Sequence, residues 1–160
     1  MKIVVDTNVA IAANGRNTHA SDKCQLACVE LLDQLTSQKS RRTICLDDLD
    51  LLLTEYKPHL NFNGQPGVGD AFYKFLHDHK YSGKKVSLVS IKPNDDADRG
   101  FDELPVNPVD HSDRKILAIA AVSKAKIVNA LDNDWHEQRD FLAGFGVEVV
   151  QLCPEHGCIK

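Results

Sequence analysis

Short apolar runs alternate along the chain with segments of helical period, and this alternation restricts the fold more than any other feature. Runs rich in apolar or β-branched residues at 2–6, 42–46, 85–91, 126–131 and 147–152 predict strands, and the run at 2–6 predicts a strand that is buried on both faces. Strands that alternate with helices favour a parallel sheet covered by helices on both faces. The sequence therefore predicts an α/β fold with a central parallel sheet.

The intervening segments carry apolar residues at helical spacing. They predict helices at 9–13, 22–38, 49–60, 71–81, 113–125 and 134–145. Either Asp47 or Asp48 is suited to cap the helix at 49–60, because a short carboxylate accepts hydrogen bonds from first-turn amides. Residues 61–70 are glycine-rich and residues 92–111 are acidic and marked by prolines, so both predict connections.

Length and composition predict one domain over residues 1–160, because 160 residues with 42% hydrophobic content can form one substantial core. No apolar run approaches the roughly 18 residues of a membrane span, and the first residues lack a signal-peptide pattern, so we expect a cytoplasmic protein with no membrane contact. The five cysteines are then expected to be reduced thiols. A net charge of −4 argues against a strongly basic nucleic-acid binder.

Acidic residues stand where the carboxyl ends of the predicted strands would meet. Asp6 ends the first strand, and Asp132 and Asp134 follow the strand at 126–131. Two further acids, Glu55 and Asp113, share helix faces with apolar residues and should point toward the sheet. Because ligands of parallel sheets bind outside the carboxyl ends of the strands, these five carboxylates are expected to converge there.

Converging carboxylates repel one another, so they need raised pKa values or a compensating cation. Mg²⁺ or Mn²⁺ is the expected cation, because both ions prefer carboxylate oxygen and keep coordination positions for water and phosphate. Such a centre activates water for the hydrolysis of a phosphodiester. The pattern therefore predicts a metal-dependent nuclease that needs no side-chain nucleophile.

Four stretches, "VVDTN", "TEY", "SDRKILAIA" and "ALDNDW", together resemble the PIN domain nuclease family, in an order that covers nearly the whole chain. The resemblance implies a three-layer α/β/α sandwich and metal-dependent cleavage of single-stranded or structured RNA. It implies catalytic roles for Asp6, Glu55, Asp113 and Asp132, and metal ligation by Asp6, Asp113 and Asp132 with Asp134 as an auxiliary ligand. Asn8, two residues after Asp6, is expected to support the site or cap the following helix rather than to bind the metal.

Two features depart from the family pattern. Ala130 stands where the family often has a hydroxyl residue, and the chain is longer than the compact toxin ribonucleases of the family. The implied partners are an RNA substrate and an inhibitory antitoxin or effector-complex protein, with a homodimer as a further option. A silent RNA- or protein-binding module of the same fold and a phosphotransfer domain are the alternative functions.

Several acids also have structural interpretations. Asp6 could form a turn, Glu55 could pair with Lys57 or His59, and Asp134 could cap a helix. Asp113 could favour the helix dipole, with Asp110 as the competing site residue.

Basic residues offer contacts for the substrate. Lys80, Lys84 and Lys85 near Tyr81 form one candidate patch, and Arg114 and Lys115 lie beside a proposed metal ligand. A zinc site at Cys153, His156 and Cys158 would need four ligands, and no partnering pair is evident, so free thiols and a surface histidine are expected there instead.

Overall fold

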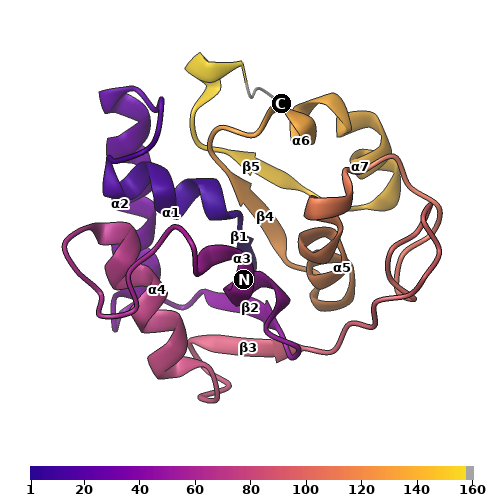
Figure 1. Ribbon diagram of the computed structural model, residues 1–160, viewed down its shortest axis with the longest axis horizontal. Helices are drawn as coiled ribbons and strands as arrows, with labels where there is room; N and C mark the ends of the chain where they lie inside the picture. The colour runs from indigo at the N-terminus through magenta and orange to yellow at the C-terminus, as the bar shows by residue number, and fades with distance from the viewer. Residues whose placement is uncertain (158–160) are drawn as a thin grey trace.

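A five-stranded parallel sheet lies at the centre of the computed structural model, which describes residues 1–157 (Figure 1). The strand order is β3-β2-β1-β4-β5, and all neighbouring pairs are parallel. The strands are β1 (Lys2–Val5), β2 (Thr43–Asp47), β3 (Val86–Val89), β4 (Lys126–Asn129) and β5 (Val149–Gln151). The predicted parallel sheet is confirmed.

Helices cover both faces of this sheet. They are α1 (Thr7–Asn14), α2 (Asp22–Thr36), α3 (Leu51–Tyr56), α4 (Val68–His79), α5 (Arg114–Ser123), α6 (Asn133–Glu137) and α7 (Arg139–Phe145). Figure 1 shows α1, α2 and α4 together on the left of the sheet and α5 on its right, where α5 packs against β1, β2 and β4. This arrangement is consistent with a three-layer sandwich.

Local chemistry accounts for the helix boundaries. Asp47 rather than Asp48 serves α3, because its carboxylate accepts hydrogen bonds from the backbone N–H groups of Leu51 at 2.8 Å and Leu52 at 2.9 Å. The prediction of a single helix over residues 134–145 is wrong, because two helices lie there. The backbone at Gln138 leaves the helical conformation, with φ −95° and ψ 14°, and separates α6 from α7.

The prediction that all cysteines are reduced is also wrong. Cys24 in α2 and Cys153 after β5 form a disulfide that joins positions 129 residues apart. The prediction failed because it relied on the composition and start of the chain, which do not reveal that these positions meet in space. Within residues 1–157, Cys28 and Cys45 are buried free thiols. Cys158 lies outside the described residues.

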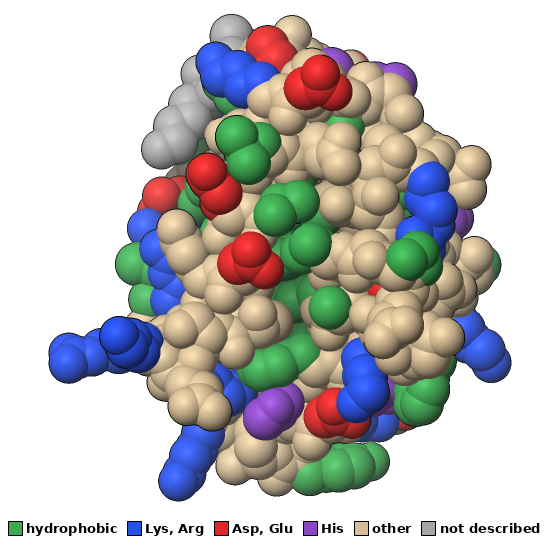
Figure 2. Space-filling view, turned by 90° about the vertical axis from the view of Figure 1, so that its left-hand side faces the viewer, with side chains coloured by type: hydrophobic (Ala, Val, Ile, Leu, Met, Phe, Trp, Pro, Cys, Tyr) green, Lys and Arg blue, Asp and Glu red, His purple; other side chains and the backbone are tan. Residues whose placement is uncertain are grey.

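The buried apolar side chains form a core on both sides of the sheet, with Ile3, Val4 and Ile127 from the central strands almost fully buried. On the outer surface of α1, α2 and α4, hydrophobic side chains remain visible between separate acidic and basic ones (Figure 2). Within the described residues, no helix combines the length and the apolar character needed to cross a membrane.

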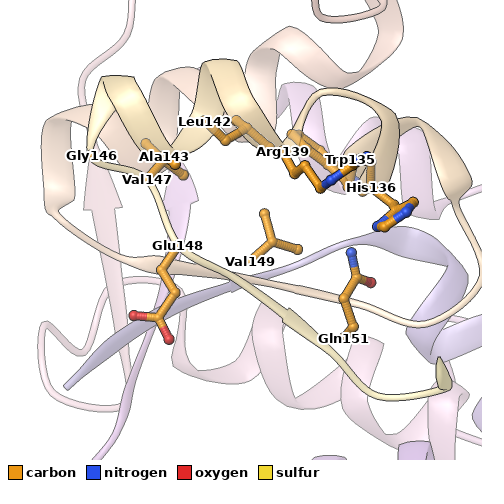
Figure 3. A pocket seen from close by; sticks show the side chains of 10 residues that line it. All are labelled: Trp135, His136, Arg139, Leu142, Ala143, Gly146, Val147, Glu148, Val149 and Gln151. Carbon is orange, nitrogen blue, oxygen red and sulfur yellow. The ribbon is translucent and has the colours of Figure 1, made fainter. Parts of the chain in front are cut away.

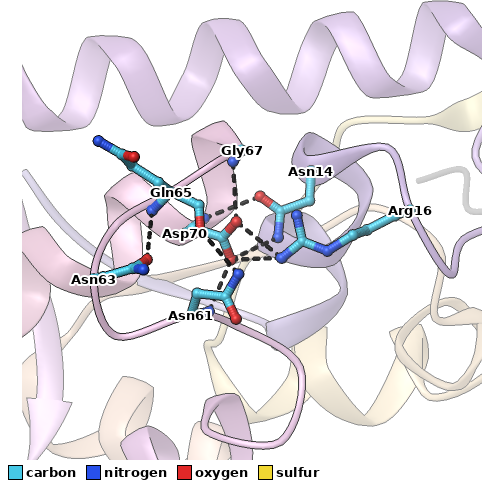
Figure 4. Close-up of polar contacts among 7 residues, drawn as sticks. All are labelled: Asn14, Arg16, Asn61, Asn63, Gln65, Gly67 and Asp70. Atoms are coloured by element: carbon cyan, nitrogen blue, oxygen red, sulfur yellow. Dashed lines mark hydrogen bonds and ion pairs between the residues drawn. The ribbon is translucent and has the colours of Figure 1, made fainter.

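A buried carboxylate holds the loop before α4 against α1 (Figure 4). Asp70 is 0% exposed and accepts hydrogen bonds from the side chains of Arg16 and Asn14 and from the backbone N–H groups of Asn61 and Gly67. Burial alone would raise the pKa of Asp70. The hydrogen bonds from the two backbone N–H groups and from the side chains of Arg16 and Asn14 outweigh this effect of burial. They hold the pKa of Asp70 below its ordinary value.

Asp70→Asn is expected to lower the free energy of unfolding by about 2–3 kcal/mol, because charge-assisted hydrogen bonds are lost and a buried amide donor replaces an acceptor. Urea denaturation at pH 7 measures the change. The control is Asp78→Asn on the same helix, where the carboxylate is half-exposed and pairs with Lys74. That variant should change stability by less than about 1 kcal/mol. Equal effects of the two variants would contradict the assigned role of Asp70.

Candidate functional site

Three carboxylates meet at the carboxyl edge of the sheet. Oxygen atoms of Asp6, Asp113 and Asp132 all lie within 4.8 Å of one another. Asp6 follows β1 and Asp132 follows β4, and these strands are neighbours with Val5 opposite Val128. Asp113 ends the 3-10 helix His111–Asp113 that leads into α5. The expected convergence therefore holds for these three residues.

Asp6 is anchored by the only tryptophan of the chain. The indole N–H of Trp135 donates a 2.7 Å hydrogen bond to Asp6 Oδ2, and both side chains are buried. Burial raises the pKa of Asp6 to about 7; the Trp135 hydrogen bond opposes this effect, and the charges of Asp132 and Glu55 add to it. Sequence reasoning missed Trp135, although its position directly after three acidic or amide residues was a usable signal.

Asp113 carries an unsatisfied oxygen. Its side chain is 6% exposed, and Oδ2 has no hydrogen-bond partner within the described part of the chain. Burial, followed by the charges of Asp6 and Asp132, raises the pKa of Asp113 to about 8. Burial also raises the pKa of Asp132. Near neutral pH this group of acids therefore holds protons unless a cation replaces them.

A pair of asparagines positions the turn that carries Asp132. Asn8 Nδ2 donates to Asn129 Oδ1 at 2.9 Å, while Asn8 Oδ1 accepts from the backbone N–H groups of Ala130 and Leu131. Asn129 in turn bonds both backbone groups of Asp132. Asn8 is thus placed to support the site through the backbone. Asn129 was missed, although a polar residue inside an apolar strand run could have indicated it.

Glu55 lies beside the three converging carboxylates but is not one of them. It accepts hydrogen bonds from the Thr7 hydroxyl and from Lys115 Nζ, the latter at 2.9 Å, and its side chain is 26% exposed. The pairing with Lys57 or His59, considered from the sequence, is replaced by the pairing with Lys115. Glu55 therefore forms part of the wall of the site, and Lys115 pairs with it from α5.

Asp134 belongs to a second group of carboxylates, with Asp110 and Asp113. Its side chain is exposed, and its backbone N–H donates to Asp132 Oδ1 at 2.9 Å. The cap of α6 is Asp132, not Asp134. Asp110 is exposed and accepts a hydrogen bond from Ser112. Asp113 is the one residue that the two groups share.

A cavity of about 440 Å³ opens over the three converging acids. Its other walls come from the segment between α1 and α2 and from the residues around α3. The lining comprises Asp6, Thr7, Asn8, Ile11, Asn17, Thr18, His19, Glu55, His59, Asp113, Leu131 and Asp132. The exposed imidazoles of His19 and His59 on these walls are groups that can bind an anion.

The structure does not support most of the predicted substrate contacts. Arg114 is 5% exposed, and its guanidinium donates to the backbone carbonyls of Val109 and Ala97, so it cannot reach a phosphate at the surface. Lys84 and Lys85 directly precede β3, at the edge of the sheet opposite the acids. Lys85 Nζ bonds backbone carbonyls after α2, and Lys80 pairs with Asp50. Lys115 alone lies next to the cavity.

A second cavity, of about 420 Å³, lies between α7 and the edge strand β5 (Figure 3). Leu142, Val147 and Val149 give it a mainly apolar lining. Trp135 contributes to this lining as well as donating to Asp6, so its indole separates the apolar cavity from the acids. No pattern in the sequence predicted this cavity.

Comparisons with protein-family models, with curated protein sequences and with solved structures gave no match to this chain.

The raised pKa values predict how metal-free stability depends on pH. A carboxyl whose folded pKa is raised binds its proton more tightly in the folded state, so it stabilises the fold at low pH. For Asp113 this stabilisation is lost as pH rises from the ordinary value of 3.8 to about 8. Relative to Asp113→Asn, the wild-type chain should lose up to about 1.4 kcal/mol per pH unit in this window.

Urea denaturation in the presence of a chelator, at pH 5 and pH 8, measures this difference. Asp78→Asn, whose carboxylate is half-exposed, serves as the control and should run parallel to the wild-type chain. If the stability difference between the wild-type chain and Asp113→Asn stays constant over this range, Asp113 does not hold the proton assigned to it.

Proposed function

We propose that this chain is a Mg²⁺- or Mn²⁺-dependent endoribonuclease of the PIN type. The observation that carries the proposal is the unpartnered Oδ2 of Asp113, which is buried and belongs to a group of three carboxylates that gather within 4.8 Å. Near neutral pH Asp113 holds a proton that it can share with Asp132. A divalent cation in place of that proton would give Oδ2 its partner and offset the charges of all three acids.

The donor set fits a hard divalent cation. Asp6, Asp113 and Asp132 offer only oxygen, and the surrounding cavity has room for water and phosphate. Trp135 and the backbone N–H of Asp134 hold one oxygen each of Asp6 and Asp132 in place. Such support is what a catalytic metal site requires of its surroundings.

The residues of the cavity wall suit the hydrolysis of a phosphodiester. A cation held by the three acids would lower the pKa of a water molecule and offset negative charge on the phosphate. Glu55, oriented by Lys115 and the Thr7 hydroxyl, can accept a proton from the attacking water. Lys115, His19 and His59 can contact phosphate oxygens of the RNA. RNA as substrate, and an inhibitory protein partner, are proposed from the resemblance to the PIN family.

Binding of Mn²⁺ should strengthen as pH rises from 6 to 8, because the cation must displace the protons held by Asp6 and Asp113. The expected gain is about tenfold per pH unit for each proton displaced. Isothermal titration calorimetry in two buffers of different ionisation enthalpy measures both the affinity and the protons released. Asp113→Asn should bind at least about tenfold more weakly at pH 8, whereas Asp78→Asn should match the wild-type chain. Affinity that does not change with pH would contradict displacement of protons from these acids.

Asp6→Asn should lower Mn²⁺-dependent cleavage of single-stranded RNA by about 100-fold or more. The amide keeps the shape of the side chain and still accepts the Trp135 hydrogen bond, so circular dichroism should show an intact fold. Single-stranded DNA of the same sequence provides a parallel substrate, and Asp78→Asn is the matched control. Equal cleavage by Asp6→Asn and Asp78→Asn would refute the assignment. A wild-type chain that binds Mn²⁺ but cleaves neither substrate would favour the silent binding module.

A further inference from the structure

Three cysteines and a histidine lie close together in space, although they come from two segments that are far apart in the sequence. Cys24 and Cys28 lie one turn apart on α2, and Cys153 and His156 follow β5. The sulfur atoms of Cys24, Cys28 and Cys153 all lie within 4.8 Å of one another. Ligand atoms of His156 and Glu155 lie within the same distance of Cys24 and of each other. We call Cys24, Cys28, Cys153 and His156 the thiol cluster.

The disulfide explains only part of the thiol cluster. It joins Cys24 to Cys153 and leaves the Cys28 thiol buried beside both sulfur atoms. Burial, with the Glu155 carboxylate, raises the pKa of Cys28 to about 12. Since the thiolate is the attacking species in disulfide exchange, Cys28 is a poor resolving cysteine near neutral pH. A disulfide alone therefore gives no role to the Cys28 thiol.

We propose that the reduced form of the thiol cluster binds Zn²⁺ through Cys24, Cys28, Cys153 and a ring nitrogen of His156. Three cysteines and one histidine make a common structural zinc site, and the spacings Cys-x₃-Cys and Cys-x₂-His suit short ligand pairs. With Zn–S bonds of about 2.3 Å, sulfur atoms in a tetrahedral site lie about 3.8 Å apart. Once the disulfide is reduced, the sulfur atoms of Cys24 and Cys153 can move apart to this spacing, and the Cys28 sulfur already lies within 4.8 Å of both. The His156 ligand atom lies within that distance of Cys24, so a rotation of its side chain would complete the site.

The two states of the thiol cluster differ by a balanced reaction. A low-molecular-weight thiol reduces the Cys24–Cys153 disulfide, delivering two electrons and two protons while two of its molecules join in a disulfide of their own. Zn²⁺ then binds the three cysteine sulfurs and His156, and the three thiol protons are released to solvent. The disulfide and the zinc centre are thus alternative links between α2 and the segment after β5.

The thiol cluster lies next to the wall of the acidic cavity. The ring of His156 packs edge-on against His19, with centroids 5.5 Å apart, and His156 Nε2 accepts a hydrogen bond from the Ser21 backbone N–H. His19 lines the acidic cavity together with Asn17 and Thr18. Either link would therefore hold this wall in place. The functional meaning of this fixed wall rests on the proposed nuclease function. The zinc site itself does not depend on that function.

The test is zinc binding by the reduced full-length chain, with Co²⁺ as a spectroscopic substitute. We expect one Zn²⁺ per chain in the thiol cluster and, with Co²⁺, the charge-transfer and d–d bands of a tetrahedral thiolate site. Asp113→Asn should keep these bands, because the carboxylate site contributes no thiolate. This readout therefore stays independent of nuclease activity and of the acidic site.

Cys28→Ser should lower zinc affinity at least about tenfold, while the Cys24–Cys153 disulfide still forms after oxidation. Cys45→Ser in β2 is the matched control, because Cys45 is a buried free thiol outside the thiol cluster. Both variants carry Cys158→Ser, so that this thiol cannot substitute. Should Cys28→Ser not fold, His156→Gln provides the same comparison. A reduced wild-type chain without thiolate–cobalt bands, or equal zinc affinity in Cys28→Ser and Cys45→Ser, would overturn the proposal.

Discussion

Electrostatic repulsion among buried carboxylates is the constraint that shapes the carboxyl edge of this sheet. Asp6 and Asp132 end neighbouring parallel strands, so the hydrogen bonding of β1 to β4 brings them together wherever the helices lie. Asp113 adds a third carboxylate from the start of α5. Burial raises the pKa of each of these acids, and only protons or a cation can make such proximity stable.

The surrounding contacts fix these acids in place rather than separating them. Trp135 holds Asp6, and Asn8 with Asn129 holds the turn of Asp132. Exposure to water would relieve the repulsion, yet the packing keeps Asp6 and Asp113 buried and leaves only Asp132 partly exposed. That combination of rigid support and electrostatic tension is typical of sites that bind a ligand or carry out catalysis.

The sequence predicted those features that depend on local pattern. Apolar runs located the strands, and the parallel sheet then placed Asp6 and Asp132 at one edge. Helical phase indicated that Asp113 would turn inward. Features that depend on long-range contacts could not be predicted in this way. The pairing of Trp135 with Asp6 spans 129 residues, and the same separation divides the two cysteines of the disulfide. Arg114 was misjudged because the charge of a residue does not reveal that backbone carbonyls will surround it.

The segment between α1 and α2 lies between the acidic cavity and the thiol cluster. On one side Asn17, Thr18 and His19 line the acidic cavity, and on the other His19 packs against His156 of the thiol cluster. The acids offer hard oxygen ligands and the thiol cluster offers soft sulfur, so the two sites would select different metals. Asp70 secures the neighbouring loop through Asn14 and Arg16 at the end of α1.

The most direct measurement is a crystal structure of the chain with Mn²⁺, with anomalous diffraction data collected at pH 8. Our account predicts an anomalous peak bounded by carboxylate oxygens of Asp6, Asp113 and Asp132, with Oδ2 of Asp113 directed at the ion. It would be contradicted by a well-ordered acidic cavity with no peak at saturating Mn²⁺, or by the three carboxylates lying too far apart to share one ion.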